Sequence, residues 1–196
     1  MRMGGATWIP QIGGTDTELS DVDFIDANNG WVVGFGECLR TRNGGVTWSL
    51  QPFFGGFGVH FVNVSEGWAV GFGFTSDYTL YFVLHTVDGG ATWYYEETDT
   101  TNLLVDVYFI NANEGWAVGY NGTIFHTIDN GTTWQKQNSG TGSWLNGVHF
   151  VNAAEGWAVG DNGTILRRRN NSSVEKFLRS DGKLRCGSKY VFPAIE

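Results

Sequence analysis

The 196-residue sequence has few of the features that mark several other classes of protein. It contains two cysteines, and their positions, Cys38 and Cys186, lack the close spacing of metal ligands. No apolar run approaches the about 20 residues that a membrane-spanning helix requires, and Met1 is not followed by a charged and then an apolar secretory segment. We therefore expect no membrane span and no signal segment in this chain, and two thiols alone do not identify its redox compartment.

Basic residues are also scarce over most of the chain. Residues 1–166 contain four basic and 17 acidic residues, a net charge of −13, whereas residues 167–196 contain eight basic and three acidic residues, a net charge of +5. An acidic body repels nucleic acid and anionic membranes and attracts a basic protein partner. We expect a repeat domain over 1–169, a basic tail or linker over 170–196, and no nucleic-acid partner.

Glycine and tryptophan, by contrast, are abundant, with 29 glycines against three prolines and nine tryptophans. This balance favours short strands joined by tight turns, and hence an all-β fold. The hexapeptide EGWAVG occurs at 66–71, 114–119 and 155–160, and NGWVVG occurs at 29–34. A short alternating strand precedes each copy, for example DVYF at 106–109.

The spacing of these copies predicts the architecture. The first glycines of the four Gly-Trp pairs are 37, 48 and 41 residues apart, and four short strands in roughly 40–45 residues are typical of a β-propeller blade. The long interval comes from extra residues around 74–83, which we expect to lengthen one hairpin at a rim. We predict about four four-stranded blades, with packing between blades by Trp31, Trp68, Trp116 and Trp157.

A second motif follows in three of the units: TRNGGVTW (41–48), TVDGGATW (86–93) and TIDNGTTW (127–134). These segments resemble the Asp box, or BNR repeat, which is structural in the families that carry it. Asp or Asn accepts backbone N–H bonds, Gly supplies a positive φ, and Trp packs beneath the hairpin. The structural Asp-box residues predicted on this basis are Asn43, Trp48, Asp88, Trp93, Asp129 and Trp134.

Together with GWAVG, the pattern looks most like the repeat of the photosystem II assembly and stability factor family. The resemblance covers about residues 4–168. It implies a non-catalytic propeller scaffold for protein–protein interaction or complex assembly, and an extracytoplasmic location that is periplasmic, thylakoid-lumenal or at the cell surface. Family members typically have seven blades and an export or lipid-attachment signal, whereas this chain has about four units and no such signal.

The two ends of the repeat region lead to alternative models of closure. The segment MGGATW (3–8) supplies only the last strand of a blade, and the last unit, 147–170, lacks its Thr-Trp strand. One model closes a four-bladed ring by pairing Ala6–Pro10 with Thr164–Arg168. The alternative is a partial ring, whose exposed blade faces would favour self-association.

Candidate functional residues lie at one variable position of the innermost strands: Asp23, His60, Tyr108 and His149. They are expected to line the propeller axis, either as a solvated channel or as a surface that binds a ligand or a partner. A second equivalent set is expected to form polar caps on an edge, and it consists of Arg40, His85, His126 and Arg167.

The sequence favours a binding protein over an enzyme. It lacks the arginine cluster and accompanying segments that sialidase chemistry needs, and a glycoside hydrolase would need two opposed carboxylates, for which Asp21 and Asp106 are the candidates. We predict no catalytic residue, no metal and no cofactor. The alternative is a carbohydrate-binding or glycoside-hydrolase-like extracellular propeller with a glycan ligand.

Overall fold

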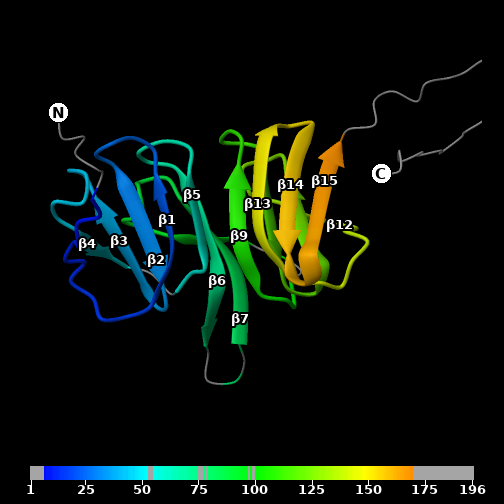
Figure 1. Cartoon of the computed structure of the whole chain (residues 1–196), viewed down its shortest axis with the longest axis horizontal. Coiled ribbons are helices and arrows are strands. Elements are labelled where there is room, and N and C mark those ends of the chain that lie inside the picture. Colours follow the sequence, from blue (N-terminus) through cyan, green and yellow to red (C-terminus); the bar gives the residue numbers. More distant parts are fainter. Residues whose placement is uncertain are drawn as a thin grey trace, which may run out of the picture.

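The computed structural model describes residues 7–52, 55–74, 77, 79–96, 98 and 100–169. These residues form four antiparallel sheets arranged as an arc of propeller blades (Figure 1). The tail over 170–196, with Cys186, lies outside the described residues, and among those that are described no helix is long and apolar enough to cross a membrane.

Three of the blades have four strands. Blade 1 consists of β1 (Leu19–Phe24), β2 (Gly30–Gly34), β3 (Glu37–Thr41) and β4 (Ser49–Gln51). Blade 2 consists of β5 (Gly58–Phe61), β6 (Gly67–Phe74), β7 (Thr79–Thr86) and β8 (Tyr94–Glu96). Blade 3 consists of β9 (Leu104–Phe109), β10 (Gly115–Gly119), β11 (Thr123–Thr127) and β12 (Gln135–Gln137), with the short 3₁₀ helix η1 (Tyr120–Gly122) between β10 and β11.

Blade 4 has three strands among the described residues: β13 (Leu145–Asn152), β14 (Glu155–Gly160) and β15 (Thr164–Arg169), with η2 (Asp161–Gly163) between the last two. The structure does not show the predicted closure, in which Ala6–Pro10 would complete this blade within the same chain. Residues 7–10 belong to no strand, and Trp8 is fully exposed. Blade 1 lies at one end of the arc and β15 at the other, so the described residues form a partial ring (Figure 1).

The Gly-Trp pair packs one blade against the next. In each blade the phenylalanine that ends the repeated inner-strand motif lies flat across this glycine, and a Cβ on Gly115 would approach the Phe109 ring to 2.5–2.6 Å. The tryptophan of the preceding blade stacks on the flat ring: Trp68 on Phe109 at 3.5 Å and Trp116 on Phe150 at 3.5 Å between centroids. The predicted packing between blades is therefore correct for Trp31, Trp68 and Trp116, which are at most 1% exposed.

The Asp boxes connect the third and fourth strands at the outer rim. In blade 3 the Thr127 hydroxyl donates to Asp129 Oδ1 at 2.9 Å, and the same oxygen accepts the Thr133 N–H at 2.9 Å. Thr86 and Asp88 repeat this arrangement in blade 2, and Asn43 reproduces it in blade 1. Trp48, Trp93 and Trp134 each meet the phenylalanine of their own blade edge-on, so all six predicted Asp-box residues have structural contacts.

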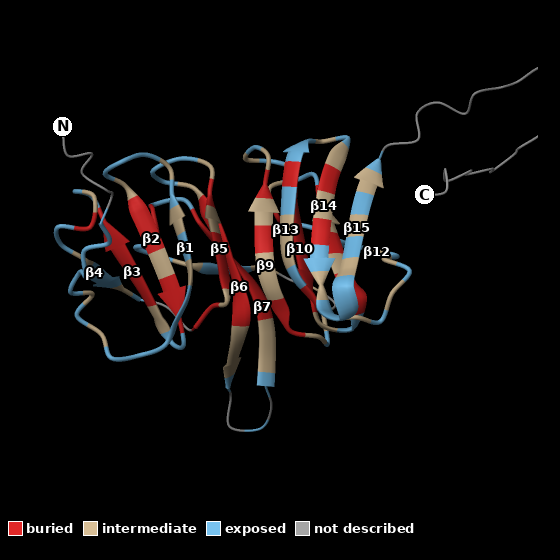
Figure 2. Ribbon diagram, viewed as in Figure 1, coloured by how far each residue is buried: buried red, intermediate tan, exposed pale blue. Residues whose placement is uncertain are grey.

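The extra residues around 74–83 lengthen the β6–β7 hairpin, whose strands have eight residues each against five in the equivalent strands of blade 3. Figure 1 shows this hairpin projecting beyond the rim of the other blades. The buried residues concentrate on the central strands of blades 1, 2 and 3, whereas β15 has no buried residue (Figure 2). The core of the molecule therefore consists of layers between blades and has no single centre.

Candidate partner-binding surface

The four residues predicted to face the axis form a continuous row across the inner strands. Asp23, His60, Tyr108 and His149 occupy β1, β5, β9 and β13, each directly across from the Gly-Trp tryptophan of its own blade. The rings of His60 and Tyr108 are 4.6 Å apart, and those of Tyr108 and His149 are also 4.6 Å apart. Because the blades form an arc, these side chains make a row and do not close into a ring.

The first half of the row connects the blades to one another. Asp23 Oδ2 accepts the Phe61 N–H at 2.6 Å, and His60 Nε2 donates to the Phe109 carbonyl oxygen at 2.9 Å. Burial lowers the pKa of His60, and the carboxylate of Asp23, 3.8 Å from its Nδ1, opposes that shift. Asp23 and His60 therefore have structural contacts that sequence reasoning did not predict.

The second half of the row is available for binding. Among the described residues, neither the Tyr108 hydroxyl nor the His149 ring forms a hydrogen bond, and their contacts are with the rings of the row. Burial and the charge of Asp23 raise the pKa of Tyr108, so its hydroxyl remains protonated at neutral pH. The surface offers a phenol donor and an imidazole side by side.

Two half-buried carboxylates, Asp21 and Asp106, lie two residues before Asp23 and Tyr108 on the same strands. Asp21 accepts the N–H groups of Val22 and Val59, and Asp106 accepts those of Val107 and Val148. Burial raises the pKa of Asp106 to about 7, although the Val148 N–H bond opposes the shift. The carboxylates that were candidates for hydrolysis thus contact backbone N–H groups of their own and the next blade.

The sequence suggested that the second equivalent set of polar residues would cap an edge. In the structure these residues lie against tryptophan rings instead. His85 and His126 stack on Trp68 and Trp116 at 4.8 and 4.6 Å, and Arg40 and Arg167 lie 5.1 Å from the rings of Trp31 and Trp157. Each Gly-Trp tryptophan thus has a cation or imidazole of its own blade on one face. The hydrophobic pattern of a single strand could not reveal these contacts, because they arise from pairing with the neighbouring strand, which places each residue beside the indole.

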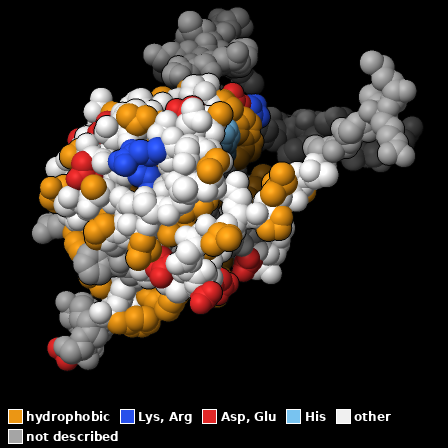
Figure 3. Space-filling model, turned by 90° about the vertical axis from the view of Figure 1, so that its left-hand side faces the viewer, with side chains coloured by type: hydrophobic (Ala, Val, Ile, Leu, Met, Phe, Trp, Pro, Cys, Tyr) orange, Lys and Arg blue, Asp and Glu red, His pale blue; other side chains and the backbone are white. Residues whose placement is uncertain are grey.

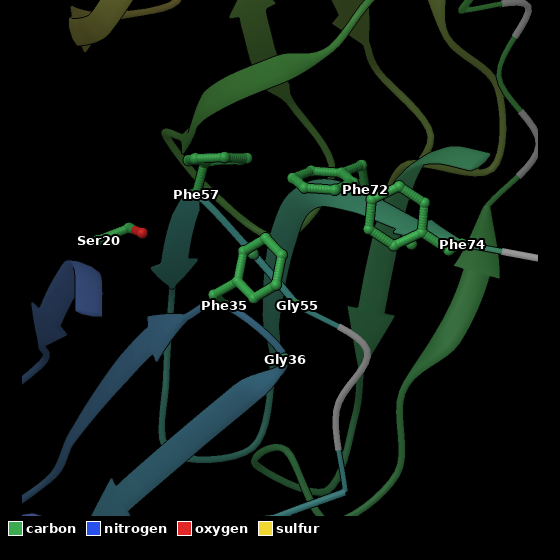
Figure 4. Close-up of a pocket in the computed structure, with 9 residues that line it drawn as sticks. Ser20, Phe35, Gly36, Gly55, Phe57, Phe72 and Phe74 are labelled. Atoms are coloured by element: carbon green, nitrogen blue, oxygen red, sulfur yellow. The ribbon is translucent and has the colours of Figure 1, made fainter. Parts of the chain in front are cut away.

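An aromatic pocket at the rim was not predicted. Phe35, Phe57, Phe72 and Phe74 surround a space of about 90 Å³ where blades 1 and 2 meet (Figure 4). Phe72 contacts each of the other three rings at 5.2–5.6 Å between centroids, and Phe35 and Phe74 are 58% and 71% exposed. The Gly-Phe runs at 53–58 and 71–74 were the sequence signal for it.

No group of three or more His, Cys, Asp or Glu side chains suited to a metal ion occurs within the described part of the chain. Cys38 is buried, which raises the pKa of its thiol to about 12.

Comparison with known proteins places this geometry among β-propellers. Residues 94–169 match the family model described as photosynthesis system II assembly factor YCF48. The BNR-repeat resemblance inferred from GWAVG and the Asp boxes is confirmed by this match and by the structures below. A search of curated proteins by sequence gives no match.

Three solved structures are similar over most of the chain. YCF48 bound to D1 peptide has a TM-score of 0.63 at 24% identity, covering 81% of this chain and 52% of that one. YCF48 from Cyanidioschyzon merolae has a TM-score of 0.62 at 23% identity, covering 81% and 55%. An ancestral GH74 enzyme has a TM-score of 0.63 at 18% identity, covering 84% and 24%. The chain thus spans about half the length of the YCF48 structures, and the likeness confirms the propeller fold.

Proposed function

We propose that this chain is a non-catalytic propeller scaffold that binds a segment of another protein along the inner-strand row, in the manner of an assembly factor. The proposal rests on the second half of the inner-strand row, which is formed by Tyr108 and His149. The two rings are in contact, their polar atoms are free, and they lie on rigid strands. An extended peptide that crosses the blades would meet both side chains.

The charge of the molecule favours a basic segment. With 17 acidic and four basic residues over 1–166, the domain attracts cations over long range, and association should weaken as salt concentration rises. The similar structure of YCF48 bound to D1 peptide supports a peptide as the ligand class. An extracytoplasmic location is part of the proposal and rests on the family resemblance.

We propose that the chain is not catalytic because its two candidate carboxylates already accept hydrogen bonds from the backbone. Asp21 and Asp106 accept two backbone N–H bonds each, from their own and from the next blade, so their oxygens already have partners within the protein. The likeness to the GH74 enzyme at 18% identity concerns the fold. The arrangement therefore supports binding better than glycoside hydrolysis.

Selection from a displayed library of random linear peptides, run in parallel with a glycan array, tests the ligand class. We expect enrichment of peptides that contain Lys or Arg and no specific glycan. Enrichment of glycans without peptides would contradict the proposal and favour the carbohydrate-binding alternative.

A pair of double variants tests the location of binding. Tyr108→Ala/His149→Ala should raise the dissociation constant of a selected peptide about tenfold or more, as expected for loss of central contacts. The matched control is Phe35→Ala/Phe74→Ala, which removes two exposed rings from the aromatic pocket and should leave the constant unchanged. The opposite pattern would move the binding site to the rim. His60 is kept in both variants because it connects two blades.

A further inference from the structure

Among the described residues, the outer edge of blade 4 has no fourth strand, whereas blades 1–3 each have one. In blades 1–3 the third strand pairs with a fourth, in the registers Arg40↔Ser49, His85↔Tyr94 and His126↔Gln135. Arg167 occupies this position on β15, and no described residue pairs with it on that side. A free edge of this kind is a template for another strand.

The N-terminal segment has the sequence of the missing strand. TWIPQ at 7–11 aligns with TWSLQ at 47–51, the last three residues of which form β4. Gln11 precedes the inner strand at Leu19 by eight positions, as Glu96 precedes Leu104 and Gln137 precedes Leu145. Residues 7–11 nevertheless form no strand, and Trp8 and Ile9 are 101% and 78% exposed.

Two aromatic residues at the interface between blades 3 and 4, Trp116 and Phe150, lack described partners that their equivalents have. Within the described part of the chain, Phe150 has no Asp-box tryptophan against its ring edge and has the Arg168 guanidinium 5.8 Å from its ring centre, whereas the phenylalanines of blades 1–3 each have such a tryptophan at 5.8–6.0 Å. Trp116 Nε1 is buried without an acceptor, whereas Trp31 and Trp68 donate to Asp-box carbonyl oxygens of the next blade. A buried N–H without a partner is costly, and a fourth strand with its box would supply both contacts.

The outer faces of blades 1 and 4 are complementary. Phe24 is 42% exposed because no tryptophan of a preceding blade stacks on it, and its neighbour Val22 is 57% exposed. At the other end, Arg167 covers one face of Trp157, and no described ring stacks on the other face. Figure 3 views the blade 1 end of the molecule, where hydrophobic side chains appear at several places on the face.

We propose that two copies of this chain join head to tail, so that residues 7–11 of one copy become the fourth strand of blade 4 in the other. In this arrangement Trp8 packs on Phe150 of the second copy, and Trp157 of the second copy stacks on Phe24. The chain cannot supply its own strand without rearrangement, because residues 7–11 lie beside blade 1, where Gln11 accepts from Trp48 at 3.1 Å, at the far end of the arc from β15 (Figure 1).

The interface is heterologous, and two such interfaces close a ring of two copies if the rotation permits. It repeats the contacts already present between neighbouring blades, so it needs no new kind of packing. The interface involves the outer blade faces and not the inner-strand row, so it does not depend on the proposed peptide binding.

Sedimentation of the full chain tests the association. We expect a dimer, and Trp8→Ala should raise its dissociation constant at least about tenfold, because Trp8 contacts no core in the single chain and is buried only in the pair. Tyr94→Ala is the control, since Tyr94 is an exposed aromatic residue of another fourth strand and should leave the constant unchanged. A monomeric wild-type chain overturns the proposal.

Disulfide trapping tests the strand pairing itself. The register of the other blades places Ile9 across from Arg167, so Ile9→Cys and Arg167→Cys are made on separate full-length chains that also carry Cys186→Ser. Mixing the two should give a covalent dimer that neither forms alone. If both cysteines on one chain give a cross-linked monomer, closure is intramolecular and the second copy is excluded. Absence of any cross-link also contradicts the proposal.

Discussion

The interface between blades 2 and 3 and the outer faces of blades 1 and 4 are built from the same motif, yet they differ greatly in burial. Phe109 is 2% exposed, whereas its equivalent Phe24 is 42% exposed. Val70 is fully buried, whereas its equivalent Val159 is 47% exposed. The Gly-Trp motif therefore specifies half of an interface, and its contribution to stability depends on whether a neighbouring blade supplies the other half.

Truncation of the stacked tryptophan should give the largest difference between the two regions. Trp68→Ala removes a fully buried indole that lies between Phe109 and His85, and we expect it to lower the free energy of unfolding by about 3–5 kcal/mol. Trp157→Ala should lower it by less than about 1 kcal/mol, since one face of that indole is free.

Chemical denaturation of both variants, made in the Trp8→Ala background so that self-association does not contribute, provides the measurement. Equal losses of stability would mean that the outer face of blade 4 is covered as completely as an internal interface, and the comparison would fail.

Glycine substitution should give a smaller difference of the same sign. An alanine at 115 places its Cβ against the Phe109 ring, which Trp68 holds from the other side, so Gly115→Ala should cost about 1–3 kcal/mol. Gly30→Ala creates the same close approach to Phe24, but that ring faces solvent and can turn away. Thermal unfolding should therefore show a clearly larger decrease in melting temperature for Gly115→Ala, and a reversed order would show that Phe24 is as constrained as Phe109.

The sequence was sufficient to predict what is local or repeated. The period of the Gly-Trp pairs predicted the blades, and the Thr, Asp and Gly spacing of the boxes predicted the turns, because both depend on contacts within one unit. The positive φ of Asn121, Asn130 and Asn162 likewise follows from Asn-Gly turns.

Features that depend on how the blades assemble into an arc could not be predicted from the sequence. Residues 7–10 do not pair with 164–168 in the structure, and strand complementarity alone says nothing of the distance that the intervening blades impose. Arg40 and His85, which precede the third-strand Thr, were expected to cap an edge, yet they are buried against tryptophans. The four-phenylalanine pocket required a lengthened hairpin from one blade to meet a turn of another.

The smallest expected effect distinguishes two rim turns that have the same geometry and different chemistry. Asn43 in blade 1 donates from Nδ2 to the Thr47 hydroxyl, whereas Asp129 in blade 3 accepts from the Thr133 hydroxyl at 2.6 Å. The Thr133 hydroxyl and N–H lower the pKa of Asp129 below its usual value of 3.8. A lowered pKa of an acid in the folded state stabilises the fold above the unfolded pKa, and this contribution is lost as the pH falls through the folded pKa.

Asp129→Asn should therefore leave stability at pH 7 nearly unchanged and remove a small part of the loss on acidification to pH 3, because the amide reproduces the blade 1 turn and does not titrate. Asp129→Ala is the control. It leaves the Thr133 N–H and the Thr127 hydroxyl without their acceptor and should cost about 1–2 kcal/mol at pH 7. Urea unfolding at the two pH values measures the difference. An Asn variant as unstable as the Ala variant at pH 7 would show that the charge, and not the hydrogen-bond pattern shared with Asn43, maintains the turn.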